Sequence, residues 1–247
     1  MHDAPQRMSI RGVEVTVVRR VAECPPLGPR DQAVVVDVLR ATSAMAAATY
    51  HGVARIWPVP EVEDAHRVRK SDPTWLLVGE RGNRRPDGFD RGNSPLEWAA
   101  TDNGASAAWT TTNGTRALFG AAGAGRLAAA AFVNRARAAR WAEQAPDHRL
   151  LLIPAGENGA ESEEDWLCCG AIVEALQHPR VSAKAGEARE AFLAVRERLA
   201  AAIRETEHGQ ALIAQGLAAD VEWSSRLDVM AVLAVRIHDD PLWLGPA

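Results

Sequence analysis

The sequence contains no long hydrophobic run. No stretch approaches the ~20 consecutive apolar residues that a membrane-spanning helix requires. The first residues, MHDAPQRMSIRG, also lack the apolar run that follows the charges of a secretory signal. Only 3 cysteines occur, and the adjacent Cys168 and Cys169 suit neither an ordinary disulfide with each other nor a CxxC metal pair. We therefore expect a cytoplasmic protein with no membrane partner.

Lysine is also scarce, and the chain carries no excess of positive charge. Lys70 and Lys184 are the only two lysines among 28 basic residues, and the formal net charge is -4. Broad nucleic-acid binding depends on a basic face, so we expect no nucleic-acid partner. The 7 histidines show no HxxxH or HxH pairing, and residues such as His208 are interpreted as scattered surface or cap positions. A zinc site is therefore not expected.

The chain contains a series of short apolar runs separated by polar turns. We interpret its 247 residues as one domain, 1–247. We predict strands at 13–18, 33–37, 54–59, 75–79, 107–112, 127–133 and 149–153. We predict helices between them at 42–51, 61–70, 95–103, 115–121 and 135–145. Alternating strands and helices indicate a layered α/β/α protein with a mainly parallel or mixed sheet.

The last third of the sequence has a different pattern. Helices are predicted at 163–177, along an alanine-rich stretch at 184–216, and near 218–222, and RIHDDPLWLGPA is interpreted as an extended tail. The 184–216 helix is amphipathic, which suits packing across the body of the protein or against a second subunit in a homo-oligomer.

Polar residues gather where the predicted strands end. In a parallel sheet the carboxyl ends of the strands form the usual ligand site, so these clusters are expected to converge in one cleft. The first is DVLRAT, in which Asp37 could ligate a metal or act as a base, Arg40 could bind an anion, and Thr42 could donate a hydroxyl. The alternative is an ion pair between Asp37 and Arg40, with Thr42 as a helix cap.

Two further clusters follow later strands. GERGNRR offers Glu80 to a divalent cation and Arg81 to an anion, unless it is simply a solvated charged loop. TTTNGTR turns into a helix, so that its backbone N–H groups, its hydroxyls and an arginine could surround an anion, unless it is simply a capped turn. Its candidate residues are Thr112, Asn113, Gly114, Thr115 and Arg116.

Two loops complete the set of candidates. In GFDRGNSPLEW, Asn93 and Ser94 are expected to donate hydrogen bonds to an anionic group. In AGENGAESEEDW, Ser162 and Asp165 have capping-box spacing, so Asp165 has a structural alternative, whereas Glu164 has none. Glu164 and Asp165 together could supply oxygen ligands to Mg²⁺.

Four stretches, VVVDVLRATSAMAAA, GERGNRRPDGFDRGNSPLEW, TTTNGTRAL and AGENGAESEEDWLCCGAI, resemble the ComB family of 2-phosphosulfolactate phosphatases in order and spacing, over residues 33–177. The resemblance implies a Mg²⁺-dependent hydrolase that converts 2-phospho-3-sulfolactate to 3-sulfolactate and phosphate, a step linked to coenzyme M synthesis. The match is looser outside these motifs, where Asp220 and Asp228 occupy positions that are similar to the family pattern.

Our mechanistic hypothesis places Mg²⁺ on carboxylates drawn from Asp37, Glu80, Glu164 and Asp165. Arg40 and Arg116 would hold charge on a small anionic phosphate ester, and Asp37 would be a base or a metal ligand. The alternatives are a phosphatase for another acidic ester, transfer of the phosphoryl group to an acceptor other than water, and a binding protein that senses a phospho-metabolite without turnover.

Overall fold

A computed structural model describes residues 12–99 and 102–247. Its strands are β1 (Glu14–Val17), β2 (Asp31–Val36), β3 (Arg55–Pro58), β4 (Leu76–Gly79), β5 (Ser106–Thr110), β6 (Arg126–Ala130), β7 (Arg149–Pro154), β8 (Arg180–Val181), β9 (Ala234–His238) and β10 (Trp243–Pro246). Its α-helices are α1 (Ala41–Tyr50), α2 (Val62–Ser71), α3 (Gly114–Gly120), α4 (Arg135–Glu143), α5 (Glu163–Ala175), α6 (Ala183–Val195), α7 (Leu199–Glu205), α8 (Glu207–Ala214) and α9 (Ala218–Ser224).

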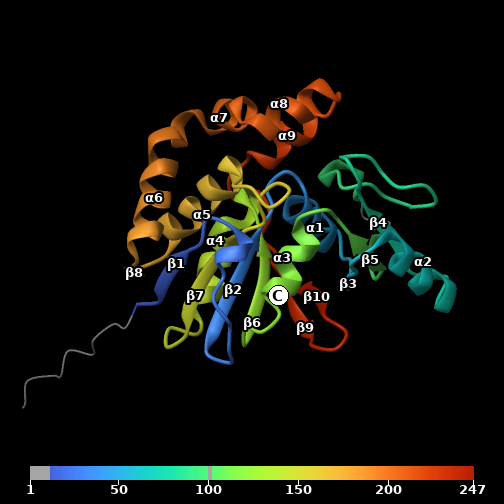
Figure 1. Cartoon of the computed structure of the whole chain (residues 1–247), viewed down its shortest axis with the longest axis horizontal. Coiled ribbons are helices and arrows are strands. Elements are labelled where there is room, and N and C mark those ends of the chain that lie inside the picture. Colours follow the sequence, from blue (N-terminus) through green and yellow to red (C-terminus); the bar gives the residue numbers. More distant parts are fainter. Residues whose placement is uncertain (1–11, 100–101) are drawn as a thin grey trace, which may run out of the picture.

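Helices cover both faces of one sheet, which confirms the layered α/β/α prediction (Figure 1). Successive residues of β2 point to opposite faces, as the pleat of a strand requires. Val34 and Val36 pack in a core with residues of α4, α5 and α6, while Ala33 and Val35 pack in a second core with residues of α1 and α3. Strand β2 is therefore buried on both sides, which explains its continuous apolar run.

The sheet consists of two parallel blocks joined by an antiparallel hairpin. The strand order is β4-β5-β3-β10-β9-β6-β2-β7-β1-β8. The pairings of β3 with β10, β10 with β9, and β9 with β6 are all antiparallel. Three reversals make the block β4-β5-β3 run opposite to the block β6-β2-β7-β1-β8. The segment that we interpreted as an extended tail is thus β9 and β10, at the centre of the sheet.

The polar clusters after β2, β4, β5 and β7 meet in one cavity, as expected, but the strands that they follow do not all run in the same direction. Between β2 and β5 lie five strand pairings, and a sheet twist of roughly 20–25° per pairing rotates one block by about 100° relative to the other. A rotation of this size turns the strand ends of the two blocks towards each other, and loops that follow strands of both blocks line the same cavity.

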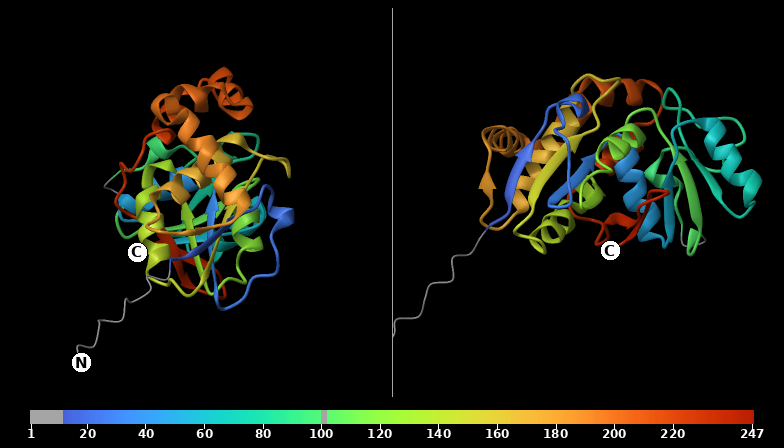
Figure 2. Two further views of the ribbon diagram at one scale, coloured as in Figure 1. Left: turned by 90° about the vertical axis from the view of Figure 1, so that its left-hand side faces the viewer. Right: turned by 60° about the horizontal axis from the view of Figure 1, so that its bottom comes forward.

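The predicted helix at 184–216 is wrong as a single element. It is divided into α6, a 3-10 turn at Arg196–Arg198, α7 and α8. Thr206 separates α7 from α8, because its extended backbone ends one helix while its hydroxyl accepts a hydrogen bond from Gly209 N at 3.0 Å and caps the next. We call residues 183–224, which comprise α6 to α9, the helical arm. The arm arches over one end of the sheet (Figures 1 and 2).

The predicted strands from 13–18 to 149–153 are confirmed, as are the helices near 42–51, 61–70, 115–121, 135–145, 163–177 and 218–222. The prediction at 95–103 differs: Pro95–Glu97 forms a 3-10 turn, and residues 100 and 101 lie outside the described residues, as does the N-terminal segment up to residue 11. No helix of the described ranges is long and apolar enough to span a membrane.

Candidate active site

The loop after β2 carries Asp37 and is held from behind by Thr42. The Thr42 hydroxyl accepts from Asp37 N at 2.9 Å and lies 2.7 Å from the Ala130 carbonyl oxygen. Asp37 Oδ1 accepts a hydrogen bond from Ala41 N at 3.1 Å, at the start of α1. Thr42 is fully buried and fixes the loop, whereas the Asp37 carboxylate faces a polar cavity.

Arg40 lines the same cavity, but its ion-pair partner is not Asp37. Its Nη1 lies 2.6 Å from Asp220 Oδ2 in α9, and its Nη2 donates to the Asn83 carbonyl oxygen at 2.9 Å. The alternative of an Asp37–Arg40 ion pair is therefore wrong. The physical reason is that α9, far along the chain, brings a carboxylate to Arg40 that no local pattern reveals.

Glu80 connects two of the loops that border the polar cavity. Its Oε1 accepts from Thr112 N and its Oε2 accepts from Asn83 N, each at 2.9 Å. The Glu80 side chain thereby ties the loop after β4 to the loop after β5. Because each carboxylate oxygen can accept more than one hydrogen bond, Glu80 keeps capacity for a ligand in the cavity.

Gly114 allows α3 to begin directly against Asp37. A Cβ atom at position 114 would lie 2.7 Å from Asp37 Oδ2 and 2.8 Å from Ala41 Cβ. Neighbouring Asn113 accepts a hydrogen bond from Asn158 N at 3.0 Å through its Oδ1, which ties this turn to the loop after β7. The absence of a side chain at Gly114 is thus required by the close approach of three loops.

These loops enclose a polar cavity of about 120 Å³, which we call the carboxylate cavity. It is lined by Asp37, Leu39, Arg40, Glu80, Gly82, Asn83, Asn93, Thr112, Asn113, Glu157, Asn158 and His208. Burial raises the pKa of Asp37 to about 6, and the charges of Glu80 and Glu164 add to that effect. An anionic Asp37 here is costly, so the cavity favours a cation or a proton beside it.

Glu164 and Asp165 stand behind the carboxylate cavity and do not line it. His208 Nδ1 lies 3.3 Å from Glu164 Oε1; burial opposes the charge of Glu164, but the hydrogen bond from His208 lowers the pKa of Glu164. Asp165 accepts from Val38 N at 2.8 Å and from Gly156 N at 3.1 Å, and burial raises its pKa well above the ordinary value. Ser162 accepts from Asp165 N at 3.2 Å, as the capping-box spacing predicts.

A second cavity of about 230 Å³, the arginine cavity, shares Thr112 with the first. It is lined by Pro60, Glu61, Arg81, Thr111, Thr112, Thr115, Arg116 and Phe119. Arg81 is held by its own neighbours, since Nη1 donates to the Glu80 carbonyl oxygen at 2.8 Å and Nη2 to Thr110 Oγ1 at 2.9 Å. Arg116 is exposed. The structure therefore places Arg40, Asn93 and Asn113 at one cavity, Arg81, Thr115 and Arg116 at the other, and Thr112 at both.

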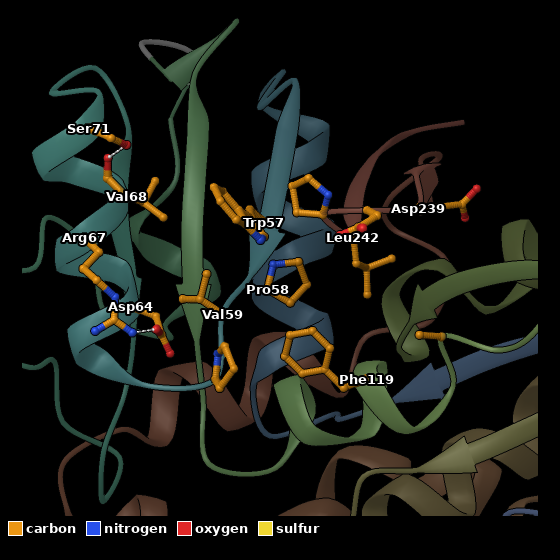
Figure 3. Close-up of a pocket in the computed structure, with 14 residues that line it drawn as sticks. Trp57, Pro58, Val59, Asp64, Arg67, Val68, Ser71, Phe119, Asp239 and Leu242 are labelled. Carbon is orange, nitrogen blue, oxygen red and sulfur yellow. Dashed lines mark hydrogen bonds and ion pairs between the residues drawn. The ribbon is translucent and has the colours of Figure 1, made fainter.

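A more spacious cavity lies elsewhere and is mostly apolar. It measures about 600 Å³ and is bordered by α2, β3 and the β9–β10 turn, with Trp57, Pro58, Val68 and Leu242 pointing into it (Figure 3). Asp64 and Arg67 pair with each other at its rim. None of the candidate residues lines this cavity, so chemistry, rather than size, identifies the site.

The remaining candidates from the loop after β4 behave differently from one another. Asn93 lines the carboxylate cavity and accepts from Trp109 Nε1 at 3.4 Å. Ser94 lines neither cavity: its hydroxyl donates to Asp220 Oδ1 at 2.7 Å. The hydroxyl that we predicted to bind an anionic ligand is therefore directed at a carboxylate of the protein.

Sequence reasoning missed several residues of the carboxylate cavity. His208 was interpreted as a scattered surface or cap residue, and Asn83, Glu157 and Asn158 were not candidates, although all four line the cavity. Asn83 has a positive φ of 66° and Asn158 one of 50°, a conformation that asparagine tolerates in tight turns. An asparagine beside glycine, as in GN and NG here, is the one local signal that could have drawn attention to these turns.

The donor set of the carboxylate cavity suits a hard cation that retains water. Within residues 12–99 and 102–247, no group of three or more His, Cys, Asp and Glu side chains is placed to hold one ion alone. Mg²⁺ does not need such a group, because one or two carboxylates with water and phosphate oxygens complete its coordination. Asp37 and Glu80 both border the cavity and can supply those carboxylates.

Comparison with known proteins identifies the family of the chain. A model of the family described as 2-phosphosulpholactate phosphatase matches residues 20–238. A probable 2-phosphosulfolactate phosphatase of Thermotoga petrophila is 34% identical over 219 residues, which cover 88% of this chain and 94% of the relative. Relatives with the same description from Carboxydothermus hydrogenoformans (35% identical, 82% and 85% covered) and Prochlorococcus marinus (35%, 87% and 93%) are similar. The chain belongs to the 2-phosphosulfolactate phosphatase family of enzymes.

Proposed function

We propose that this protein hydrolyses 2-phospho-3-sulfolactate to 3-sulfolactate and phosphate, in the carboxylate cavity and with Mg²⁺. The observation that carries the proposal is the juxtaposition of Asp37 and Glu80 with Arg40 in one small polar cavity. Cation-binding and anion-binding groups side by side suit a phosphate ester bound together with a divalent metal. Family membership supports the substrate.

The residues of the chain have distinct parts in this proposal. Arg40 binds the non-reacting phosphoryl oxygens, where its charge is available in a site that is screened from water. Asn93 and Asn113 border the same cavity, and their polar groups orient the ester. Water attacks the phosphorus directly, so no covalent enzyme intermediate is needed.

Asp37 and Glu80 would hold the Mg²⁺ ion, which, when bound, offsets charge on the phosphoryl oxygens and lowers the pKa of water. Asp37 suits two roles. A carboxylate with a pKa near 6 is mostly ionised at neutral pH yet basic enough to accept a proton from water. The same carboxylate can instead serve only as a metal ligand.

The arginine cavity supplies the proposed specificity. It adjoins the carboxylate cavity at Thr112 and carries Arg116, whose guanidinium matches the oxygens of a sulfonate or carboxylate. The anionic end of the substrate that does not react would lie there. Preference for a sulfonated ester would then depend on Arg116.

The decisive experiment measures phosphate release from 2-phosphosulfolactate and from 2-phospholactate, with Mg²⁺ and with EDTA. We expect Mg²⁺-dependent release that favours the sulfonated ester and is reduced, but still measurable, in Asp37→Asn. Asp147→Asn, which alters an exposed carboxylate between α4 and β7, is the matched control and should keep wild-type activity.

A Mg²⁺ titration of residual Asp37→Asn activity separates the two roles of Asp37. A raised Mg²⁺ requirement indicates a ligand, whereas a lower kcat at an unchanged requirement indicates a base. Equal release from both esters would remove the sulfonated substrate but keep the phosphatase. No release from either ester, with tight binding of both, would assign the protein to the sensors of phospho-metabolites.

A further inference from the structure

The helical arm contributes the buried carboxylate of Asp220, which contacts Arg40 but does not itself line the carboxylate cavity. Asp220, in the first turn of α9, is 4% exposed and does not line the carboxylate cavity. Its Oδ2 lies 2.6 Å from Arg40 Nη1, and its Oδ1 accepts a hydrogen bond from Ser94 at 2.7 Å. Both oxygens of Asp220 are therefore used, one on each of two loops.

Ser94 is itself fixed. Its hydroxyl oxygen accepts from Leu96 N at 3.2 Å, as the N-cap of the turn Pro95–Glu97. One hydroxyl group thus donates to Asp220 and accepts from the backbone. The three residues Arg40, Ser94 and Asp220 come from segments up to 180 positions apart in the sequence and form one connected hydrogen-bond chain.

Arg40 is held by hydrogen bonds to the protein and keeps further N–H donors for a ligand. A guanidinium has five N–H donors. Within the described part of the chain, Arg40 uses two contacts, to Asp220 and to the Asn83 carbonyl oxygen. The remaining donors belong to a side chain that lines the carboxylate cavity.

A buried ion pair of this kind is poor evidence for a role in stability alone. Removing two charges from water costs free energy that their attraction often fails to offset, so an apolar pair of similar size would stabilise a fold as well. The pair instead holds a flexible arginine in one conformation before the ligand arrives, which removes an ordering cost from binding. Displacement of such a group by about 1 Å can reduce a rate by about 100-fold.

We propose that Asp220, supported by Ser94, is a positioning residue that holds the Arg40 guanidinium in the orientation that receives the phosphoryl group. This inference deepens the proposed function and rests on it for the nature of the ligand. Asp220 touches neither the ligand nor the reacting atoms. The helical arm thereby becomes part of the site.

A double-mutant cycle tests the proposal with the full-length chain, using Asp220→Asn, Arg40→Ala and the double variant. The first readout is the affinity for inorganic phosphate by calorimetry in the presence of Mg²⁺, and the second is kcat/KM for 2-phosphosulfolactate. We expect Asp220→Asn to weaken phosphate binding by at least about 10-fold and kcat/KM by about 10- to 100-fold. In the Arg40→Ala background the same change should add nothing.

Two further variants separate positioning from folding. Glu222→Gln changes an exposed carboxylate on the same helix and should leave both readouts unchanged. Ser94→Ala removes one support of Asp220 and should give a smaller loss in the same direction. A smaller folded fraction reduces the apparent kcat and the number of binding sites but does not change the phosphate Kd, so a changed Kd cannot come from misfolding.

An unchanged phosphate Kd in Asp220→Asn, or losses that add fully to those of Arg40→Ala, would overturn the inference. If the wild type binds phosphate but hydrolyses no ester, the proposed hydrolase function fails while the binding cycle still decides the role of Asp220. Absence of phosphate binding by the wild type would overturn both.

Discussion

The sheet and the helical arm contribute to the site in different ways. Loops at the ends of β2, β4 and β5 carry Asp37, Glu80 and Thr112 to the wall of the carboxylate cavity. The arm contributes His208 to that wall and Asp220 behind it. The charged groups proposed for chemistry thus follow strand ends, whereas the arm supplies the side chains that pair with Arg40 and with Glu164.

The largest expected effect comes from Glu80→Gln, which alters the sheet side alone. In an amide, one of the two oxygen atoms that accept from Thr112 N and Asn83 N is replaced by an NH2 group, which donates only, so one loop loses its acceptor atom. The substitution also removes a negatively charged group that we propose as a Mg²⁺ ligand. We expect kcat/KM to fall about 1000-fold, equivalent to about 4 kcal/mol, in steady-state assays. Glu63→Gln, at an exposed site in α2, is the control, and activity within tenfold of wild type would contradict the role of Glu80.

The next two predictions concern the free energy of unfolding, which a substitution on the sheet side should raise and one in the arm should lower. Asp37 has a raised pKa in the folded state, so its contribution to stability is most favourable below pH 3.8 and falls as pH rises towards about 6. Above that pH the buried charge costs up to about 3 kcal/mol, from a shift of roughly two units. Asp37→Asn should therefore unfold at higher urea concentration than wild type at pH 8 in EDTA, and the gain should vanish near pH 4.

His208→Gln should instead lower the free energy of unfolding, because it breaks the contact between the arm and Glu164. Burial lowers the pKa of His208, but the hydrogen bond with Glu164 raises it above the ordinary value overall. The stabilisation is complete below pH 6.5 and is lost as pH rises through the folded-state pKa. We expect a loss of about 1 to 2 kcal/mol at pH 6 and less at pH 9, measured by urea unfolding. A loss that grows with pH would contradict this pairing.

The smallest effect is expected in the arginine cavity. Arg116→Ala should raise the KM for 2-phosphosulfolactate by about 3- to 10-fold, because an exposed arginine contributes modestly to binding. The KM for 2-phospholactate, which lacks the sulfonate, should stay within twofold. Arg140→Ala, on the outer surface of α4, serves as the control. Equal changes for both esters would show that Arg116 does not distinguish them.

The sequence predicts the sheet side of the site better than the arm side, for a physical reason. A buried strand followed by a polar loop is a local pattern, so Asp37, Glu80 and Asn113 were identified from their neighbours alone. The amphipathic pattern of residues 184–216 shows that one face is buried but not which partner buries it. His208 and Asp220 act through contacts with Glu164 and Arg40, 44 and 180 positions away, and no spacing rule reveals them.

The direction of the strands was hidden for the same reason. Each βα unit predicts a parallel pairing with a near neighbour, and both blocks of the sheet follow that rule. Only the β9–β10 hairpin decides how the blocks are joined. Its residues show the strand pattern weakly, with Gly245 and Pro246 in β10, and so they were interpreted as a tail.

The central hairpin has a consequence for synthesis of the chain on the ribosome. Strands β9 and β10 leave the ribosome after every other strand, yet they lie between β3 and β6. Until they arrive, each block has one additional unpaired edge, β3 in one block and β6 in the other, and such edges readily pair with other chains. The nascent polypeptide therefore passes through a stage in which nearly all of its strands have been synthesised but the two blocks of the sheet are still separate. At this stage each block has an edge strand that can associate with other chains.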